Sequence, residues 1–136
     1  MKIGLFAALT LSAALLASSP SIEAKPRPPQ DQLARITAGR TAGEPMDCIF
    51  LRDISSSEIV ARTAIVYRLS NGTVVVNRPS SGANFLNRGD VLVTDTHSSQ
   101  LCSIDTVRLV DSGTHMPSGS VGLGKFIPYP RLPRRN

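Results

Sequence analysis

The dipeptide Asn71-Gly72 constrains the fold of this chain more than any other feature, because it separates two strand-like runs. In residues 58–69, apolar and β-branched residues alternate with arginines and serines, which is the period-two pattern of a half-buried strand. Asn-Gly is the preferred centre of a two-residue type I′ turn, and residues 73–77 supply a returning strand. The segment therefore predicts a β-hairpin.

This two-residue loop also predicts the register of the hairpin. It places Leu69 opposite Val74 and Tyr67 opposite Val76, so that aromatic and β-branched side chains share the buried face. Arg68 then lies on the other face of the hairpin.

Further strand patterns occur at residues 91–96, 104–110 and 122–127, with turn-rich segments between them. The only helix signal is short and covers residues 30–38, with Leu33, Ile36 and Ala34 on one stripe. No strand alternates with a long helix, which argues against a parallel sheet. The sequence predicts a mostly β fold: a small antiparallel sheet or partly closed barrel with a short N-terminal helix.

The N-terminus has the pattern of a secretory signal. Lys2 precedes an apolar run over residues 3–17, and small residues lead to Ala24, the predicted cleavage site. This apolar run is too short for a spanning helix, which needs about 20 residues. The predicted organisation is a signal peptide at 1–24, a flexible leader at 25–29, a single β-rich domain at 30–128 and a basic, proline-rich tail at 129–136.

Export favours a disulfide between Cys48 and Cys102, because exported proteins fold in oxidising compartments. Closing a loop of this length stabilises a fold by about 4 kcal/mol in the chain-entropy description. The alternative is a pair of free, buried cysteines that act as small apolar residues. Two cysteines together with His97 and His115 lack the closely spaced ligand pairs of a zinc site, so no metal is expected.

Two short motifs suggest catalysis, but each departs from the pattern that its chemistry requires. Residues 119–125, GSVGLGK, match the start of a phosphate-binding loop, but Phe126 replaces the required serine or threonine, and no nucleotide cofactor is expected. Asp95, His97 and Ser98 or Ser99 suggest a small hydrolase, yet the members of known triads come from separated parts of a chain. We therefore expect no catalytic residues, with a small exported hydrolase as an alternative.

The charge of the chain points to an anionic partner. Beyond residue 24, fourteen basic side chains face nine acidic ones, and much of the excess lies at the two ends. Nucleic acid does not fit an exported chain that lacks the aromatic platform of single-strand binders. The competing interpretation is that the basic ends are merely solubilising. The candidate contacts for an anionic partner are Lys25, Arg27, Arg131, Arg134 and Arg135.

Several blocks of the sequence carry a resemblance: LARITAGRTAGEPMDC, CIFLRDISSSEIV, the hairpin with Asn77, SSQLCSIDTVRLV and VGLGKFIPY. They resemble a family of small exported proteins of unknown activity from sphingomonads and related alphaproteobacteria. Some members have further cysteines near residues 79–84 and just before the last Leu-Gly, where this chain has Ser80, Ser81 and Val121. The resemblance implies an exported protein and leaves Cys48 and Cys102 as the one bridge.

Together these features predict a periplasmic or secreted domain with a non-enzymatic binding or structural role in the cell envelope, without a membrane span. The partner would be an envelope component or a protein. Besides the hydrolase, an alternative is an inhibitor of an exported enzyme, which would present the loop at residues 79–90 or 111–120 as a rigid wedge.

Overall fold

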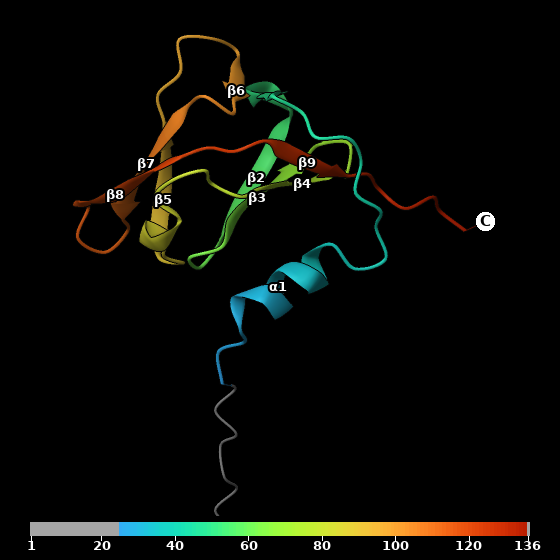
Figure 1. Cartoon of the computed structure of the whole chain (residues 1–136), viewed down its shortest axis with the longest axis horizontal. Coiled ribbons are helices and arrows are strands. Elements are labelled where there is room, and N and C mark those ends of the chain that lie inside the picture. Colours follow the sequence, from blue (N-terminus) through green and yellow to red (C-terminus); the bar gives the residue numbers. More distant parts are fainter. Residues whose placement is uncertain (1–24, 136) are drawn as a thin grey trace, which may run out of the picture.

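The computed structural model describes residues 25–135, so the predicted signal peptide at 1–24 lies outside the described residues. The described part is mostly β, with one helix and antiparallel sheets that do not close into a barrel (Figure 1). The predicted fold class is thereby confirmed. The strand orders are β2-β3-β4-β9 in a four-stranded sheet, β5-β7-β8 in a three-stranded sheet and β1-β6 in a small two-stranded sheet.

The bounds of the elements follow the chain from helix to last strand. The helix is α1 (Pro29–Ile36), and two short 3-10 turns are η1 (Leu51–Asp53) and η2 (Ala83–Phe85). The strands are β1 (Cys48–Phe50), β2 (Ile54–Val60), β3 (Ala64–Leu69), β4 (Val74–Asn77), β5 (Asp90–Thr94), β6 (Gln100–Cys102), β7 (Thr106–Asp111), β8 (Pro117–Gly122) and β9 (Phe126–Tyr129).

The helix begins one residue earlier than predicted and ends two residues earlier. Pro29 occupies its first position, where the missing N–H of proline costs no hydrogen bond. Leu33 is buried and Ile36 packs partly against the sheet, as the stripe predicts, whereas Ala34 is exposed. Figure 1 shows α1 lying against the four-stranded sheet, on the side opposite the small β1-β6 sheet.

The predicted half-buried strand is buried on both faces. Ile65 and Tyr67 of β3 pack into the main core between the sheets, while Val66 packs with Val76 and Leu33 under α1. Alternation in the sequence was therefore a misleading guide. The helix covers the face that would otherwise meet water, so both sets of side chains are apolar.

The segment 58–69 is also two strands rather than one. A turn at residues 61–63 reverses the chain, with the Thr63 N–H donating to the Val60 carbonyl at 3.0 Å. Arg62 adopts a φ of 54°, and its N–H donates to the Leu86 carbonyl at 3.0 Å. No glycine, proline or asparagine marks this turn, and a bond to a distant loop supports it, so local sequence did not predict it.

The predicted hairpin is present, but its turn and register were wrong by one residue. Gly72 donates to the Leu69 carbonyl and Leu69 to the Thr73 carbonyl, both at 2.9 Å, which closes a three-residue loop. Gly72 has a φ of 85°, as in a turn followed by a left-handed glycine. The observed register pairs Tyr67 with Val75.

Of the three remaining predicted strands, two have slightly different bounds in the structure and one is not a single strand. Residues 91–96 and 104–110 correspond to β5 and β7, each displaced by one or two residues. The predicted final strand at 122–127 is wrong, because it spans the end of β8 and the start of β9, which belong to different sheets. The buried Asn77 holds the break: its Nδ2 donates to the Gly124 carbonyl at 2.7 Å, and its Oδ1 accepts from the Gly124 N–H at 3.0 Å.

The disulfide between Cys48 and Cys102 is confirmed, and the alternative of free cysteines is wrong. The two cysteines face each other across β1 and β6. Since β1 leads through η1 into the four-stranded sheet and β6 leads into the three-stranded sheet, the bridge ties the two main sheets together.

Candidate functional site

An open groove of about 910 Å³ lies between α1, β2 and β5. The strand β2 is an edge of the four-stranded sheet, and β5 is an edge of the three-stranded sheet. Both edges line the groove, and they do not pair with each other in the described chain. The volume is within the usual range of ligand sites. The groove is lined by Lys25, Arg27, Gln32, Arg35, Ile36, Ser57, Glu58, Ile59, Arg88, Asp90, Val91 and Leu92.

Four cationic side chains reach this groove from three separate segments. Lys25 and Arg27 come from the leader, Arg35 from the last turn of α1, and Arg88 from the loop before β5. Within residues 25–135, no carboxylate lies within 4.0 Å of the charged atoms of Lys25, Arg27 or Arg35. These charges are therefore available to an anion.

The two carboxylates of the groove are engaged by neighbouring side chains. Glu58 accepts from Gln32 Nε2 at 2.7 Å and is paired with Arg68 Nη2 at 3.2 Å. Gln32 in turn accepts from Arg88, which links α1 to the loop before β5. Asp90 accepts a hydrogen bond from the Ser118 hydroxyl. The groove thus presents more positive than negative charge to a ligand.

Apolar side chains form the floor of the groove. Ile59 is 7% exposed and belongs to the main core, against which Leu92 packs. Val91, at the rim, is 51% exposed. An apolar floor with charged walls suits a ligand that has both apolar and anionic groups.

The five cations proposed from the sequence do not form one site. Lys25 and Arg27 line the groove, whereas Arg131 lies over Gly72 at the hairpin loop, in a shallow depression shared with Arg40. Residues 134–135 are exposed in the C-terminal extension, which leaves the far end of β9 (Figure 1). The structure therefore separates groove cations from tail cations.

The triad suggested by the sequence is not assembled. Asp95 is paired with Arg108 at 3.9 Å, and the Ser98 hydroxyl donates to the Gln100 carbonyl at 3.0 Å. His97 is exposed, and among residues 25–135 no hydrogen bond joins it to either side chain. This segment lacks the geometry of a nucleophile and its base.

The glycine-rich stretch at residues 119–125 is extended rather than a phosphate-binding loop. Its first half lies in β8, and the residues after it enter β9 instead of opening a helix. Ser81 bridges to Gly122, and the Ser80 hydroxyl donates to the Leu123 carbonyl at 2.9 Å. The loop at 79–84 therefore packs on β8.

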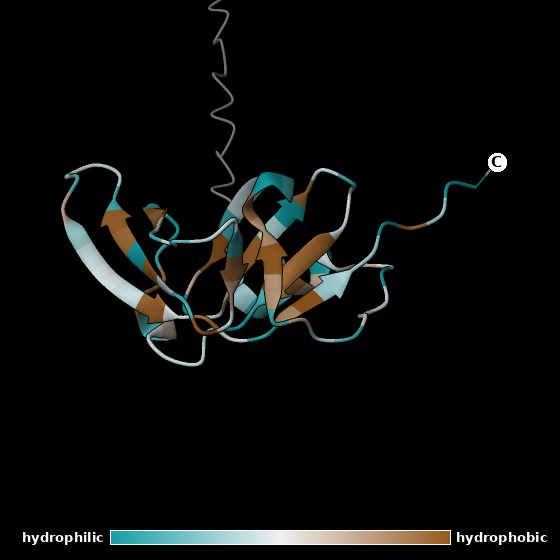
Figure 2. Cartoon of the chain, turned by 90° about the horizontal axis from the view of Figure 1, so that it is seen from above, coloured by the Kyte–Doolittle hydropathy of each residue, from teal (hydrophilic) through white to brown (hydrophobic). Residues whose placement is uncertain are grey.

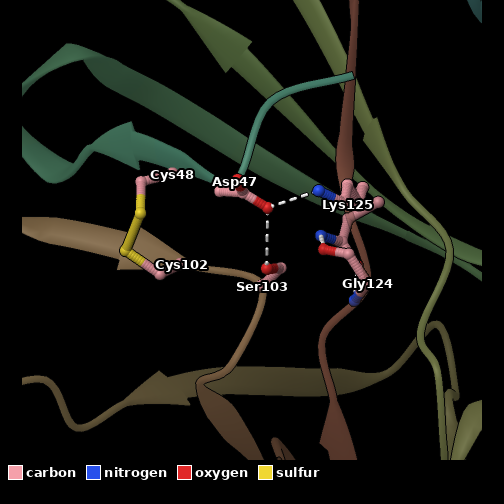
Figure 3. A network of polar contacts seen from close by, with 7 residues as sticks. Asp47, Cys48, Cys102, Ser103, Gly124 and Lys125 are labelled. Carbon is pink, nitrogen blue, oxygen red and sulfur yellow. Dashed lines mark hydrogen bonds and ion pairs between the residues drawn. A yellow bond between two sulfur atoms is a disulfide. The ribbon is translucent and has the colours of Figure 1, made fainter.

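A polar clasp, missed in the sequence, lies beside the disulfide (Figure 3). The Asp47 carboxylate accepts from Lys125 Nζ at 2.7 Å and from the Ser103 hydroxyl at 3.5 Å. The Lys125 ammonium lowers the pKa of Asp47 through its hydrogen bond and its charge. Because Lys125 is already paired with a carboxylate, we assign this clasp a structural role.

The groove itself was only partly visible in the sequence. Lys25 and Arg27 were singled out as terminal charges, but Gln32, Arg35 and Arg88 were missed. Gln32 and Arg35 belong to α1 and Arg88 to the loop before β5, and only the packing of α1 beside β2 and β5 brings them together. Clusters built from separate segments leave no local sequence signal.

No family model, curated protein or solved structure matches this chain. Across residues 25–135, no helix has the length and apolar character needed to cross a membrane. The same residues contain no cluster of His, Cys, Asp or Glu that could hold a metal ion. The chemistry of the groove is thus the main structural guide to function.

Proposed function

We propose that this chain is an exported, non-enzymatic β-domain that binds an anionic component of the cell envelope or an acidic protein. The observation that carries the proposal is the convergence of Lys25, Arg27, Arg35 and Arg88 on one groove. A concave cluster of like charge attracts the opposite charge and raises its rate of association.

The periplasm or the outside of the cell is the proposed location. The disulfide is compatible with a non-cytoplasmic protein, since such bonds persist in oxidising compartments. The secretory pattern at residues 1–24 and the resemblance to small exported proteins of sphingomonads and related alphaproteobacteria point the same way. The hydrolase alternative gains no comparable support, because the His97 segment lacks triad geometry. For the inhibitor alternative, residues 79–84 of the first loop pack against β8, and the exposed turn at residues 112–116 of the second loop remains the candidate wedge.

A matched pair of charge reversals tests the binding site. The double variant Lys25→Glu/Arg27→Glu removes two groove cations, and Arg134→Glu/Arg135→Glu makes the same change of charge in the tail. Binding would be measured at low and high salt to anionic vesicles, to purified peptidoglycan and to polyglutamate. We expect the groove variant to weaken binding to at least one of these, and the tail variant to retain it.

Two results would overturn the proposal. One is the absence of salt-sensitive binding to all three anionic probes, and the other is equal loss of binding in the two double variants. The location is tested separately by the intact mass of the protein from its native cell, with and without reduction. A mass for residues 25–136 less two hydrogens is expected, whereas a full-length mass with free thiols contradicts export.

A further inference from the structure

The edge of β5 has little protection against pairing with another strand. Its pairing with β7 runs without interruption from Asp90 opposite Asp111 to Thr94 opposite Val107. The strand, DVLVT, contains no proline, lysine or arginine. Natural edge strands are commonly protected by such residues, by bulges or by a covering segment. In β5 the one charged residue is Asp90 at its start, and the pairing with β7 contains no bulge.

The other edge in the groove is better protected. The register of β2 shifts between Ile54 and Ser56, as at a β-bulge, and its Glu58 side chain is tied to Gln32 of α1. A bulge bends an edge and disrupts further pairing. Of the two strands, β5 is therefore the better template for an added strand.

The open edge coincides with the cationic groove. Asp90, Val91 and Leu92 line it together with Lys25, Arg27 and Arg35. Alternate residues of an edge strand direct their N–H and C=O groups away from their own sheet, and these groups are ready to pair with another chain. The N–H of Asp90 already donates to the Asn87 carbonyl at 3.2 Å, so the free edge covers the four residues that follow it and is about 13 Å long at ~3.3 Å per residue.

We propose that the groove binds an extended segment of an acidic polypeptide, which adds as a fourth strand beside β5. Main-chain hydrogen bonds to β5 give affinity for an extended backbone, and the groove cations select carboxylate side chains. The apolar floor at Ile59 and Leu92 accepts the intervening residues. This inference rests on the proposed function and names the partner class for the same groove.

Charge disfavours the second copy of this chain as the occupant. Pairing two β5 edges would bring the groove cations of both copies together, on a protein with a net charge of +5. Like charges placed face to face across an interface are unfavourable. An acidic segment has the complementary charge and leaves the chain monomeric.

The test uses a synthetic peptide in which glutamate and valine alternate, with the whole protein as it exists. Two companion peptides are N-methylated, one at every glutamate and the other at every valine. Only one of these sets of N–H groups faces β5 in an added strand. We expect one companion to bind about tenfold more weakly or worse, since it loses several main-chain hydrogen bonds, and the other to match the parent.

Amide hydrogen exchange locates the bound strand. The parent peptide should slow exchange of amides in residues 90–94, and Lys25→Glu/Arg27→Glu should weaken its binding while Arg134→Glu/Arg135→Glu does not. Equal affinity of all three peptides overturns strand addition yet leaves an anion-binding groove. Binding of anionic vesicles or peptidoglycan but not the peptide overturns the polypeptide partner alone. A dimer that disappears when the protein is diluted and protects residues 90–94 identifies a second copy as the occupant and overturns the proposal.

Discussion

The two main sheets differ in how they are covered. The four-stranded sheet is buried on both faces, by the main core on one side and by α1 on the other, and β4 is buried along its whole length. The three-stranded sheet meets the core on one face only, through residues such as Leu109 and Val121. Figure 2 shows β8 in pale colours, in keeping with its small and polar residues.

We infer that the four-stranded sheet contributes most of the stability and that the three-stranded sheet contributes the surface for binding. A sheet buried on both faces gains most from the removal of apolar surface from water and offers little free surface. The three-stranded sheet contributes the edge of β5, which has no bulge, whereas the register of the β2 edge shifts between Ile54 and Ser56. The disulfide and the neighbouring clasp join the two sheets, and they lie at the end of the molecule away from α1 (Figure 1).

The largest expected effect concerns the bridge between the sheets. Reduction, or Cys102→Ala, should lower the free energy of unfolding by about 4 kcal/mol, because the unfolded chain regains the freedom of a long loop. Denaturant unfolding with and without reductant measures it. The double variant Cys48→Ala/Cys102→Ala serves as a control and should be insensitive to reductant. An unchanged midpoint on reduction contradicts this account of the bridge.

The second largest loss of stability is expected at Asn77, whose side chain holds the backbone of Gly124 between β8 and β9. Asn77→Ala removes both hydrogen bonds to the Gly124 backbone in a fully buried setting. Leaving these backbone groups unpaired should cost about 2–4 kcal/mol of unfolding free energy. Thermal or urea unfolding gives the value, and Asn71→Ala, at the exposed hairpin loop, is the matched control. If Asn77→Ala lowered the free energy of unfolding by less than the control does, the side chain of Asn77 would not be what holds the segment between β8 and β9.

The covered and open faces can be compared directly with one residue from each. Leu33→Ala should cost about 2–3 kcal/mol, because Leu33 is 6% exposed and seals the helix-covered face. Val91→Ala, at the 51% exposed position on β5, should change the free energy of unfolding by about 0.5 kcal/mol or less. Equal losses in urea unfolding would remove the distinction between the two sheets.

A smaller effect is expected at the hairpin loop. Gly72→Val should cost about 1–2 kcal/mol, since a φ of 85° is unfavourable for a β-branched residue and its Cβ would lie 2.8 Å from Arg131 Cδ. Gly89→Ala is the control, because nothing lies within 4 Å of its added Cβ. Thermal unfolding of both variants checks this, and retention of full stability in Gly72→Val would argue against the left-handed glycine.

The smallest effect is electrostatic and belongs to the clasp. Since Lys125 lowers the pKa of Asp47, the carboxylate contributes stability above its unfolded pKa and loses that contribution as pH falls through the folded pKa. Lys125→Gln should move the folded pKa of Asp47 upward, toward its usual value, as followed by NMR titration. The charge-preserving variant Lys125→Arg is the control and should leave the pKa of Asp47 lowered. An unmoved Asp47 would show that the contact with Lys125 is not formed in solution.

The sequence predicted what local signals encode. Asn71-Gly72 predicted a hairpin, and the cysteines together with the predicted export signal favoured a disulfide; the hairpin and the disulfide are both present. The turn type was wrong because Asn-Gly also suits a three-residue loop with a left-handed glycine. Burial on both faces was missed because it depends on where α1 packs, which alternation within a strand does not reveal.

The groove was less predictable for the same reason. Its walls come from the leader, the helix and the segment before β5, so the relevant residues are far apart in sequence. The terminal cations were visible as charge, but charge alone gave no way to separate Lys25 and Arg27 from Arg134 and Arg135. Tertiary packing makes that distinction.

The central claim is that anions bind in the groove rather than at the basic tail. The most direct measurement is a two-dimensional NMR titration of the protein with polyglutamate at low salt, followed residue by residue. We predict that shift changes concentrate at residues 57–59 and 88–92 and reverse on addition of salt. Shift changes confined to residues 131–135 would contradict the account and assign the binding to the tail.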